Sequence, residues 1–226
     1  MLKPLPALAV WGGFVLLGKL LGGGSGGGSG GYATSSDPSR LPPEIIAFTK
    51  ACEGLTYEAR PDANLWSIGY GNTRWKDGTP VQSGDVILSQ QQAEDLMVFW
   101  LLKGFDHYRK TIPNFDLMSD GQKAALMSFG YNVGKYWYNS PSFTTISKAV
   151  SERPDLVPYA LLLYSSSGGK RLLGLVRRRY AEGLLWNGTW SKEDGGPGKC
   201  YPNLSQEQAD AMISEARSKL GISASS

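Results

Sequence analysis

The sequence predicts an α+β fold in which one small β-sheet lies near the front of a mostly helical domain. Apolar residues recur at helical spacing in several segments that begin at capping residues and end at glycine or proline. Residues 65–71 differ, because they combine aromatic and β-branched residues with glycine in the manner of a short strand. Since the strand signal comes early and helices follow it, we expect a sheet that is segregated from the helices.

Composition limits the function. The 226 residues are 41% hydrophobic and 19% charged, which suits one globular domain with appendages. The net charge of +3 is too small for the dense basic stripe of a nucleic-acid-binding protein, so nucleic acid is not expected as a partner. The single histidine, His107, and the two cysteines, Cys52 and Cys200, cannot build a histidine-rich site or a zinc site. We therefore expect neither a metal nor another cofactor.

Residues 1–31 are predicted to form a weak apolar signal-anchor segment that ends in a glycine-rich stretch. Lys3 precedes an uncharged apolar run over residues 4–18, as in an export signal, but the run is shorter than the roughly 20 residues that span a bilayer. Three interpretations fit: an uncleaved signal-anchor that later leaves the bilayer, a conventional export signal, and an engineered tail, because residues 22–31 (GGGSGGGSGG) are typical of a flexible linker. The first is favoured, and residues 32–41 then form a polar tether.

The folded domain is predicted to begin at residue 42 with a helix over residues 43–53. Pro43 is tolerated in the first turn of a helix, and Glu44 lies favourably at the positive end of its dipole. Gly54 ends the helix and leaves Glu53 in the last turn. The negative end of a helix and partial burial both disfavour the carboxylate anion, so we expect Glu53 to favour the protonated form that a general acid requires.

A small antiparallel sheet is predicted next. Residues 65–71 form one strand, residues 76–80 form a turn, and a neighbouring strand is expected near Val81. Further helices follow, several of them starting at capping boxes. They are expected over residues 89–108, 119–134, 172–186 and 205–220, with two shorter helices between residues 141 and 165.

Three polar side chains near the predicted sheet suit the chemistry of glycosidic bonds. Glu53 and Asp62 are carboxylates, and Ser67 adds a hydroxyl on the predicted strand. Two carboxylates on opposite walls of a cleft can protonate a leaving sugar oxygen and position water. Trp66 and Tyr70 could stack on a sugar ring in the same cleft, although packing in the core explains these aromatic residues equally well.

Several ordered motifs carry a resemblance to a known family. They are EGL at 53–55, Asp62, WSIGYGNT at 66–73, DG at 77–78, QKAAL and YNVG within 122–134, and GLVRRR at 174–179. Over roughly residues 43–190 this pattern resembles the phage-type lysozymes, glycoside hydrolase family 24. The shared order of the motifs makes the resemblance specific, since any one of them alone would be weak.

The resemblance implies a muramidase that hydrolyses the β-1,4 bond between N-acetylmuramic acid and N-acetylglucosamine in peptidoglycan. It implies a lysozyme-like fold, with a small sheet-bearing lobe and a larger helical lobe flanking a cleft. Residues 42–190 would form the catalytic domain, and residues 191–226 a C-terminal extension with a terminal helix. By motif, Glu53 takes the general-acid position and Asp62 the second carboxylate position. A monomer is expected.

The resemblance also assigns Ser67 and Asn132, and the chain departs from the family near the first of these. Ser67 stands where the family usually has threonine, and Asn132 borders the cleft. Four residues separate Asp62 from Ser67, where the family usually has five. Serine lacks the methyl group that restrains a threonine rotamer, but it keeps the hydroxyl, so we expect the chemistry to survive. Asn72 stands where many relatives have histidine.

Two further features have alternative interpretations. Cys52 adjoins Glu53, so a Cys52–Cys200 disulfide would fasten the C-terminal extension beside the site, and two unpaired thiols are the alternative. Basic residues 177–179 could meet an anionic wall polymer, although a solvated or salt-bridged helix face is the more common meaning of such a run.

Together these features predict an exported phage endolysin that acts on peptidoglycan glycan strands in the host periplasm. It would first be tethered to the inner membrane through residues 1–31. Two other functions are possible. A lytic transglycosylase would cleave with Glu53 alone, which Asp62 argues against. A non-catalytic wall-binding protein would keep the fold without the chemistry, which the presence of both carboxylates argues against.

Overall fold

A computed structural model describes residues 37–62, 64–191 and 203–223 of the chain. The predicted signal-anchor segment and part of the C-terminal extension therefore lie outside the described residues. The α-helices of the described part are α1 (Pro43–Glu53), α2 (Gln90–Thr111), α3 (Asp120–Val133), α4 (Thr144–Glu152), α5 (Val157–Leu162), α6 (Leu173–Trp186) and α8 (Gln206–Lys219). Its strands are β1 (Thr56–Asp62), β2 (Leu65–Gly69), β3 (Ser166–Ser167) and β4 (Lys170–Arg171). Short 3-10 helices occur at Pro38–Arg40, Phe115–Leu117, Pro141–Phe143 and Pro154–Leu156.

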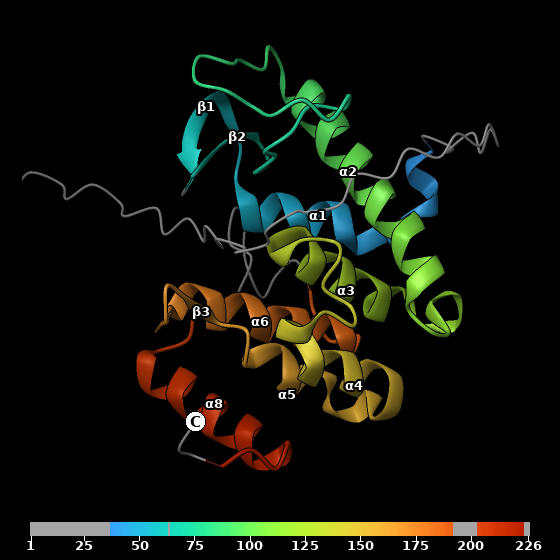
Figure 1. Cartoon of the computed structure of the whole chain (residues 1–226), viewed down its shortest axis with the longest axis vertical. Coiled ribbons are helices and arrows are strands. Elements are labelled where there is room, and N and C mark those ends of the chain that lie inside the picture. The colour runs from blue at the N-terminus through green and yellow to red at the C-terminus, as the bar shows by residue number, and fades with distance from the viewer. Residues whose placement is uncertain (1–36, 63, 192–202, 224–226) are drawn as a thin grey trace, which may run out of the picture.

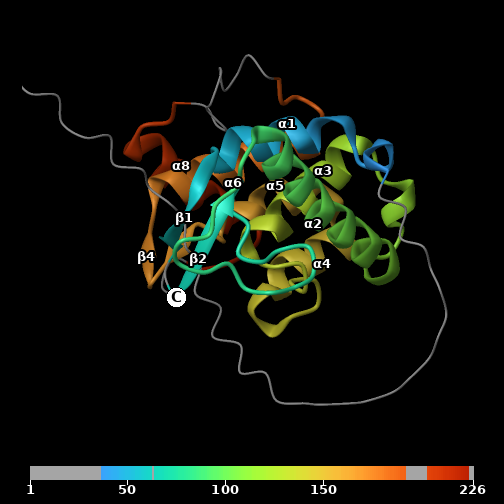
Figure 2. The ribbon, with the colours of Figure 1, turned by 90° about the horizontal axis from the view of Figure 1, so that it is seen from above.

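The elements form two lobes (Figure 1). The smaller lobe holds the β1–β2 hairpin and the loop that follows it, and the larger lobe holds α3, α4, α5, α6 and α8. Helix α2 runs from the sheet lobe to the helical lobe and packs against both β2 and α3, while α1 packs against α3. Seen from above, the hairpin and α2 lie side by side over the helical lobe (Figure 2). This arrangement confirms the predicted α+β fold with a sheet-bearing lobe and a larger helical lobe.

The pairing within the sheet lobe differs from the prediction. Strand β2 was expected to pair with a segment near Val81, but its partner is β1, which precedes it in the chain. Near Val81 the chain forms only an isolated bridge between Arg74 and Pro80. The sequence of β1, TYEARPD, has poor intrinsic strand propensity because it carries charged residues and a proline. Pairing with β2 makes it a strand, and that contact is not visible in its own sequence.

The helical lobe is organised around α3 and α6. Residues 124–130 of α3 are all buried, so this helix lies inside the lobe and not on its surface. Helix α6 packs against α3 on one side and α5 on another. The capping box predicted at Ser119 is present: its hydroxyl accepts from the Gln122 N–H, and the Gln122 side chain accepts from the Ser119 N–H.

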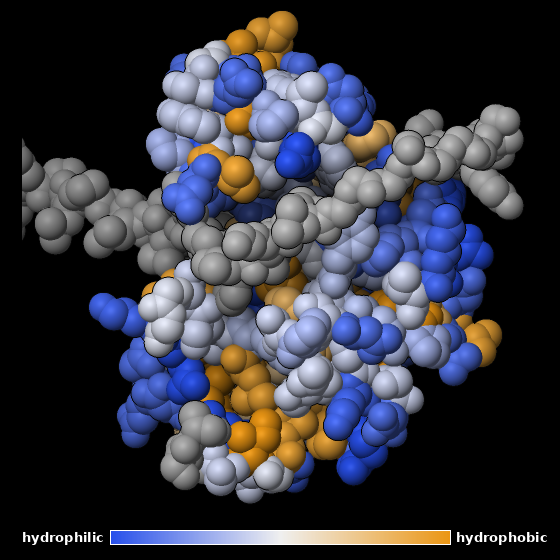
Figure 3. Space-filling view, in the orientation of Figure 1, coloured by the Kyte–Doolittle hydropathy of each residue, from blue (hydrophilic) through white to orange (hydrophobic). Residues whose placement is uncertain are grey.

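The C-terminal helix α8 packs on the helical lobe through a second, smaller apolar cluster. Its residues Ala209, Ile213 and Ala216 are buried against α5 and α6. In the space-filling view, apolar side chains gather low on the face where α8 lies, whereas they are scattered singly over the sheet lobe (Figure 3). Within the described ranges, the search for a helix long and apolar enough to cross a membrane finds none.

Candidate active site

Glu53 is the last residue of α1 and lies where the two lobes meet. The helix ends there because Gly54 adopts a positive φ of 67° and its N–H bonds back to the Lys50 carbonyl. The Glu53 side chain is only 14% exposed. A Cβ placed on Gly71 would lie 3.0 Å from Glu53 Oε2, so the backbone of the sheet lobe closes against this carboxylate. Gly71 also has a positive φ, of 77°, which is a second reason for glycine at this position.

A buried chain of alternating charges begins at Glu53. Arg178 Nη1 lies 2.7 Å from Glu53 Oε1, and Arg178 Nε lies 3.4 Å from the carboxylate of Glu182. Glu182 is fully buried; it also pairs with Arg179 and accepts a hydrogen bond of 2.8 Å from the Ser128 hydroxyl. Burial lowers the pKa of Arg178, but the charges of Glu53 and Glu182 outweigh that effect and raise the pKa above its ordinary value.

This ion-pair chain changes the interpretation of two sequence features. Of the basic run at 177–179, Arg178 and Arg179 are buried in ion pairs, so these two residues do not face a wall polymer. The position at a helix end was expected to favour protonated Glu53. The structure adds an ion pair that the sequence did not indicate, because the Arg178 guanidinium lies beside the Glu53 carboxylate.

Asp62 and Ser67 lie on the two strands of the β1–β2 hairpin. The register pairs Arg60 with Ser67 and Asp62 with Leu65. Because side chains alternate along a strand, this register places Asp62 and Ser67 on the same face of the hairpin as diagonal neighbours. Ser67 is buried, with 5% of its surface exposed. Burial also raises the pKa of Asp62 above its ordinary value of 3.8.

Tyr131 of α3 joins the helical lobe to the sheet lobe beside Glu53. Its hydroxyl donates a 2.8 Å hydrogen bond to the carbonyl of Tyr70. Burial raises the pKa of Tyr131 well above its ordinary value, and the charge of Glu53 adds to the increase. Nearby, Asn72 Oδ1 and Arg178 Nη2 are buried polar atoms without a hydrogen-bond partner among the described residues. Such atoms can serve a substrate or its attacking water.

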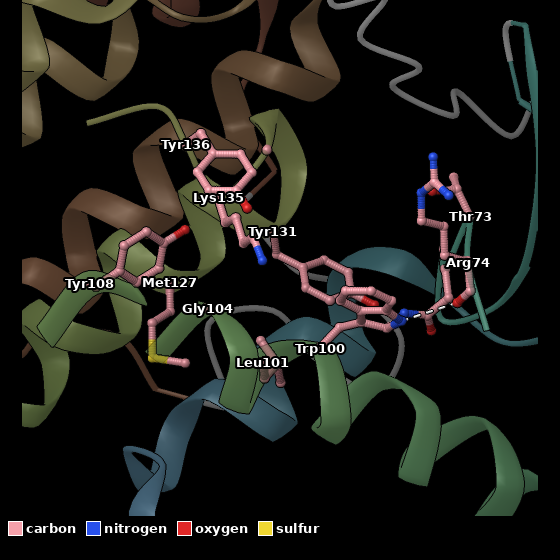
Figure 4. A pocket seen from close by; sticks show the side chains of 14 residues that line it. Thr73, Arg74, Trp100, Leu101, Gly104, Tyr108, Met127, Tyr131, Lys135 and Tyr136 are labelled. Atoms are coloured by element: carbon pink, nitrogen blue, oxygen red, sulfur yellow. Dashed lines mark hydrogen bonds between the residues drawn. The ribbon is translucent and has the colours of Figure 1, made fainter. Parts of the chain in front are cut away.

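A pocket of about 330 Å³ opens next to this site. The sheet lobe lines it with residues 71–74, α2 with residues that include Trp100, and α3 and the following turn with residues that include Tyr131 and Tyr136. Figure 4 shows Thr73 and Arg74 at one end of the pocket, Lys135 and Tyr136 at the other, and the rings of Trp100 and Tyr131 between them. Since a Cβ on residue 71 would lie 3.0 Å from Glu53 Oε2, the pocket adjoins the carboxylate.

The three residues that were predicted to contact the substrate, Trp66, Tyr70 and Asn132, are not among the residues that line this pocket. Trp66 is partly buried against the core. Tyr70 is 3% exposed, and the Lys50 ammonium lies 5.8 Å from the centre of its ring, which fits the packing alternative. The side-chain oxygen of Asn132 accepts a hydrogen bond from Arg179.

The aromatic residues that do line the pocket were missed as candidates from the sequence. Trp100 lies in an apolar stripe of α2 and Tyr131 lies in a motif of α3, so both patterns indicate core packing. Only the crossing of the two helices places their rings in a pocket wall.

Cys52 is disulfide-bonded in the structure. The other cysteine of the chain, Cys200, lies outside the described residues, so the pairing stays a prediction.

Comparisons with known proteins agree with this architecture. Residues 50–182 match the sequence model of a family described as phage lysozyme. An endolysin of Bacillus phage PZA is 32% identical over 145 residues, which are 63% of this chain and 53% of that protein. A SAR-endolysin of Haemophilus phage HP1 is 25% identical over 132 residues, which are 54% of this chain and 67% of that protein. The chain thus spans about half the length of its Bacillus phage relative.

The fold is also similar to a solved structure. An endolysin from the Escherichia coli O157:H7 phage FAHEc1 superposes with a TM-score of 0.54 and 27% identity, over 65% of this chain and 92% of that one. Its match covers nearly the whole of that protein, so the similarity is to a complete fold and not to a fragment. Since the family match also spans more than half of the chain, the chain belongs to the phage lysozyme family.

Proposed function

We propose that this chain is an endolysin muramidase, which hydrolyses the β-1,4 bond between N-acetylmuramic acid and N-acetylglucosamine in bacterial peptidoglycan and so lyses the host cell. The observation that supports this most directly is the placement of Glu53. It is a nearly buried carboxylate at the junction of the two lobes, held by Arg178 and adjoining a pocket. The family membership and the relatives named endolysin support the same proposal.

In the proposed mechanism, Glu53 donates its proton to the oxygen of the leaving sugar while water attacks the anomeric carbon from the opposite face. Asp62 and Ser67 position that water, and the carboxylate of Asp62 accepts a proton from it as the carbon–oxygen bond forms. Asp62 and Ser67 share one face of the hairpin, which suits joint contact with a single water. Inversion would require about 6.5–9.5 Å between the two carboxyl groups.

The test uses Glu53→Gln, which keeps the shape of the side chain and removes the acidic proton. We expect the rate of lysis of purified sacculi to fall by about a hundredfold or more, with the fold intact by circular dichroism. Mass spectrometry of the released muropeptides should show the addition of water. Anhydro-muramic products from the wild-type chain would instead identify a transglycosylase. Sacculi that bind the protein without losing turbidity would indicate a wall-binding protein.

The cellular location belongs to the same proposal. We propose that residues 1–31, which lie outside the described residues, export the chain and first tether it to the inner membrane. Release would then let the enzyme reach peptidoglycan in the periplasm. The similarity to a protein named SAR-endolysin supports this. Fractionation of the full-length chain and of a chain without residues 1–31 tests it, and full-length protein found only in the cytosol would contradict it.

A further inference from the structure

The first described residues of the domain are fastened to the side of α2. Residues Pro38–Arg40 form a 3-10 helix that packs against α2 (Figure 1). The Arg40 guanidinium pairs with Asp106 and lies 5.6 Å from the centre of the Phe105 ring. Residues 1–36 precede this helix, so the segment that contains the apolar run joins the domain at the C-terminal half of α2.

Basic side chains lie around this attachment point. The face of α2 that carries Asp106 also carries three of them, at intervals of three or four residues, namely Lys103, His107 and Lys110. Lys135 reaches the same region, because its ammonium lies 4.9 Å from the centre of the Tyr136 ring and that ring contacts His107. Burial lowers the pKa of His107 below its ordinary value, and the charges of Lys135 and Lys110 lower it further, as expected of one cluster.

Carboxylates do not neutralise the lysines of this cluster. Asp106 pairs with Arg40, and Asp116, just beyond the end of α2, pairs with Arg109 at 2.7 Å. Across residues 37–62, 64–191 and 203–223, the ion pairs between described residues leave out all three lysines, Lys103, Lys110 and Lys135. This part of the surface therefore carries a net positive charge, which suits an anionic partner.

Two exposed apolar side chains accompany the lysines. Leu117 lies in the 3-10 helix Phe115–Leu117, which packs against α2, and it is 85% exposed. Tyr136 is 69% exposed. In the space-filling view, hydrophilic side chains cover the edge of the molecule over the C-terminal half of α2, with apolar side chains at its lower end (Figure 3). Such a mixture suits the headgroup region of a bilayer, since apolar groups enter the acyl boundary while cations meet lipid phosphates.

We propose that a patch on the folded domain contacts the anionic lipid headgroups of the membrane. This α2 patch consists of Lys103, Lys110, Leu117, Lys135 and Tyr136. The inference rests on the proposed tether of residues 1–31 and adds a second contact, made by the domain itself. Because the tether joins the domain beside Asp106, one helical turn from Lys110, entry of the apolar run into the bilayer would keep this face close to the lipid.

A second group of exposed apolar residues, on the sheet lobe, lacks the positive charge. Leu88 is also 85% exposed, and Val86 is 52% exposed. Their neighbours are carboxylates, because Asp85 precedes Val86 and Glu58 pairs with Val86 in an isolated bridge. An anionic bilayer would repel these carboxylates, so the combination of charge and apolar exposure favours the α2 patch.

The experiment measures binding of the full-length chain to vesicles, so that every variant carries the same residues 1–31. Partition into vesicles of phosphatidylcholine measures the tether, and phosphatidylglycerol adds anionic lipid. We expect Lys103→Gln and Lys110→Gln each to lower partition into the anionic vesicles about fivefold and to leave partition into the neutral vesicles unchanged. Lys219→Gln is the matched control and should change neither. Like Lys110, Lys219 is an exposed lysine in the last turn of its helix, and α8 lies far from α2 (Figures 1 and 2).

Leu117→Gln separates a bilayer from a soluble anionic polymer. Because it removes an apolar contact, partition into anionic vesicles should fall about fivefold, whereas binding to soluble polyglutamate should not change. Leu88→Gln changes an equally exposed leucine and should affect neither. Raising the ionic strength should weaken the contribution of the lysines and leave that of Leu117. If the lysine variants lost binding to polymer and vesicles alike while Leu117→Gln lost neither, the partner would be a polyanion and the proposal would fail.

Lysine labelling distinguishes failure of the patch from failure of the tether, and neither readout depends on hydrolysis of peptidoglycan. On anionic vesicles Lys103 and Lys110 should react several-fold more slowly with an amine-reactive reagent, by mass spectrometry, while Lys219 keeps its rate. Binding to neutral and anionic vesicles without this protection would overturn the patch and leave the tether. Protection on anionic vesicles without binding to neutral ones would support the patch and refute the tether. Absence of binding to either vesicle would overturn both, provided that thermal melts show folded protein.

Discussion

Two neighbouring regions of the molecule use positive charge in opposite ways. At the catalytic end, defined by Glu53, Arg178 and Glu182, the guanidinium is buried and paired with carboxylates on both sides. At the pocket end, defined by Lys135, Tyr136 and Trp100, the ammonium is half-buried and makes no ion pair with a described residue. A paired, buried cation fixes neighbouring groups in position, whereas an unpaired cation in an open pocket is available to a ligand.

The largest effect is expected from changing the buried partner at the catalytic end. Glu182→Gln would leave Arg178 and Arg179 buried without their shared carboxylate, so the free energy of unfolding should fall by about 3 kcal/mol. Arg178 would also lose the partner that holds its guanidinium beside Glu53, so the rate of lysis should fall as well.

Glu152→Gln is the matched control for this change, because Glu152 is an exposed glutamate at the end of α4. Urea denaturation and the rate of lysis of sacculi measure the two effects. If Glu182→Gln lost stability but kept the wild-type rate of lysis, Glu182 would support the fold without influencing Glu53. If neither quantity changed, the contrast between the two ends would fail altogether.

A smaller effect is expected where the backbone of the sheet lobe meets Glu53. Gly71→Ala places a methyl group about 3 Å from Glu53 Oε2 and forces alanine into a left-handed conformation. Gly78→Ala carries the same backbone cost at a φ of 90°, with open space around the added methyl group. We expect Gly78→Ala to cost about 1 kcal/mol and to keep its activity, while Gly71→Ala loses both stability and activity. Equal activities for the two variants would show that Glu53 moves aside freely.

The loss of activity at acid pH tests the role of Asp62 on the β1–β2 hairpin. Asp62 acts in the proposed mechanism as a carboxylate, and burial raises its pKa above 3.8. Activity should therefore fall as the pH drops through a midpoint that lies above 3.8, and the protonation of Asp62 itself should not lower the stability of the fold. Asp62→Asn should abolish this acid limb along with most of the activity. An acid limb that persists in the residual activity of Asp62→Asn would assign it to another group.

How much of this site the sequence could predict depends on how far apart in the sequence the contacting residues lie. The last residue of α1 follows from Gly54, and the first residue of α3 follows from the Ser119 capping box. Both are local signals, and both helix boundaries were predicted correctly. Strand β1 was missed because its own residues disfavour a strand and only pairing with β2 forms it. The ion pair between Arg178 and Glu53 and the wall residue Trp100 were missed for a similar reason. Their partners lie far away in the sequence, and a helical pattern does not reveal which helix will cross which.

The smallest predicted effect is a shift in the pKa of His107, which reports on the unpaired charge of Lys135 at the pocket end. His107 has a lowered pKa, first because it is partly buried and then because Lys135 and Lys110 repel its protonated form. Lys135→Gln removes one of these repulsions, so the pKa of His107 should rise while staying below the ordinary value of 6.5, since burial and Lys110 remain. Lys148→Gln changes an exposed lysine of α4 that does not line the pocket, and it should leave the pKa of His107 unchanged. NMR titration of the single histidine in the chain measures this shift without interference from other imidazoles. A His107 pKa that did not respond to Lys135→Gln would mean that the ammonium spends its time away from Tyr136, and the pocket end would then lack the unpaired charge that distinguishes it from the catalytic end.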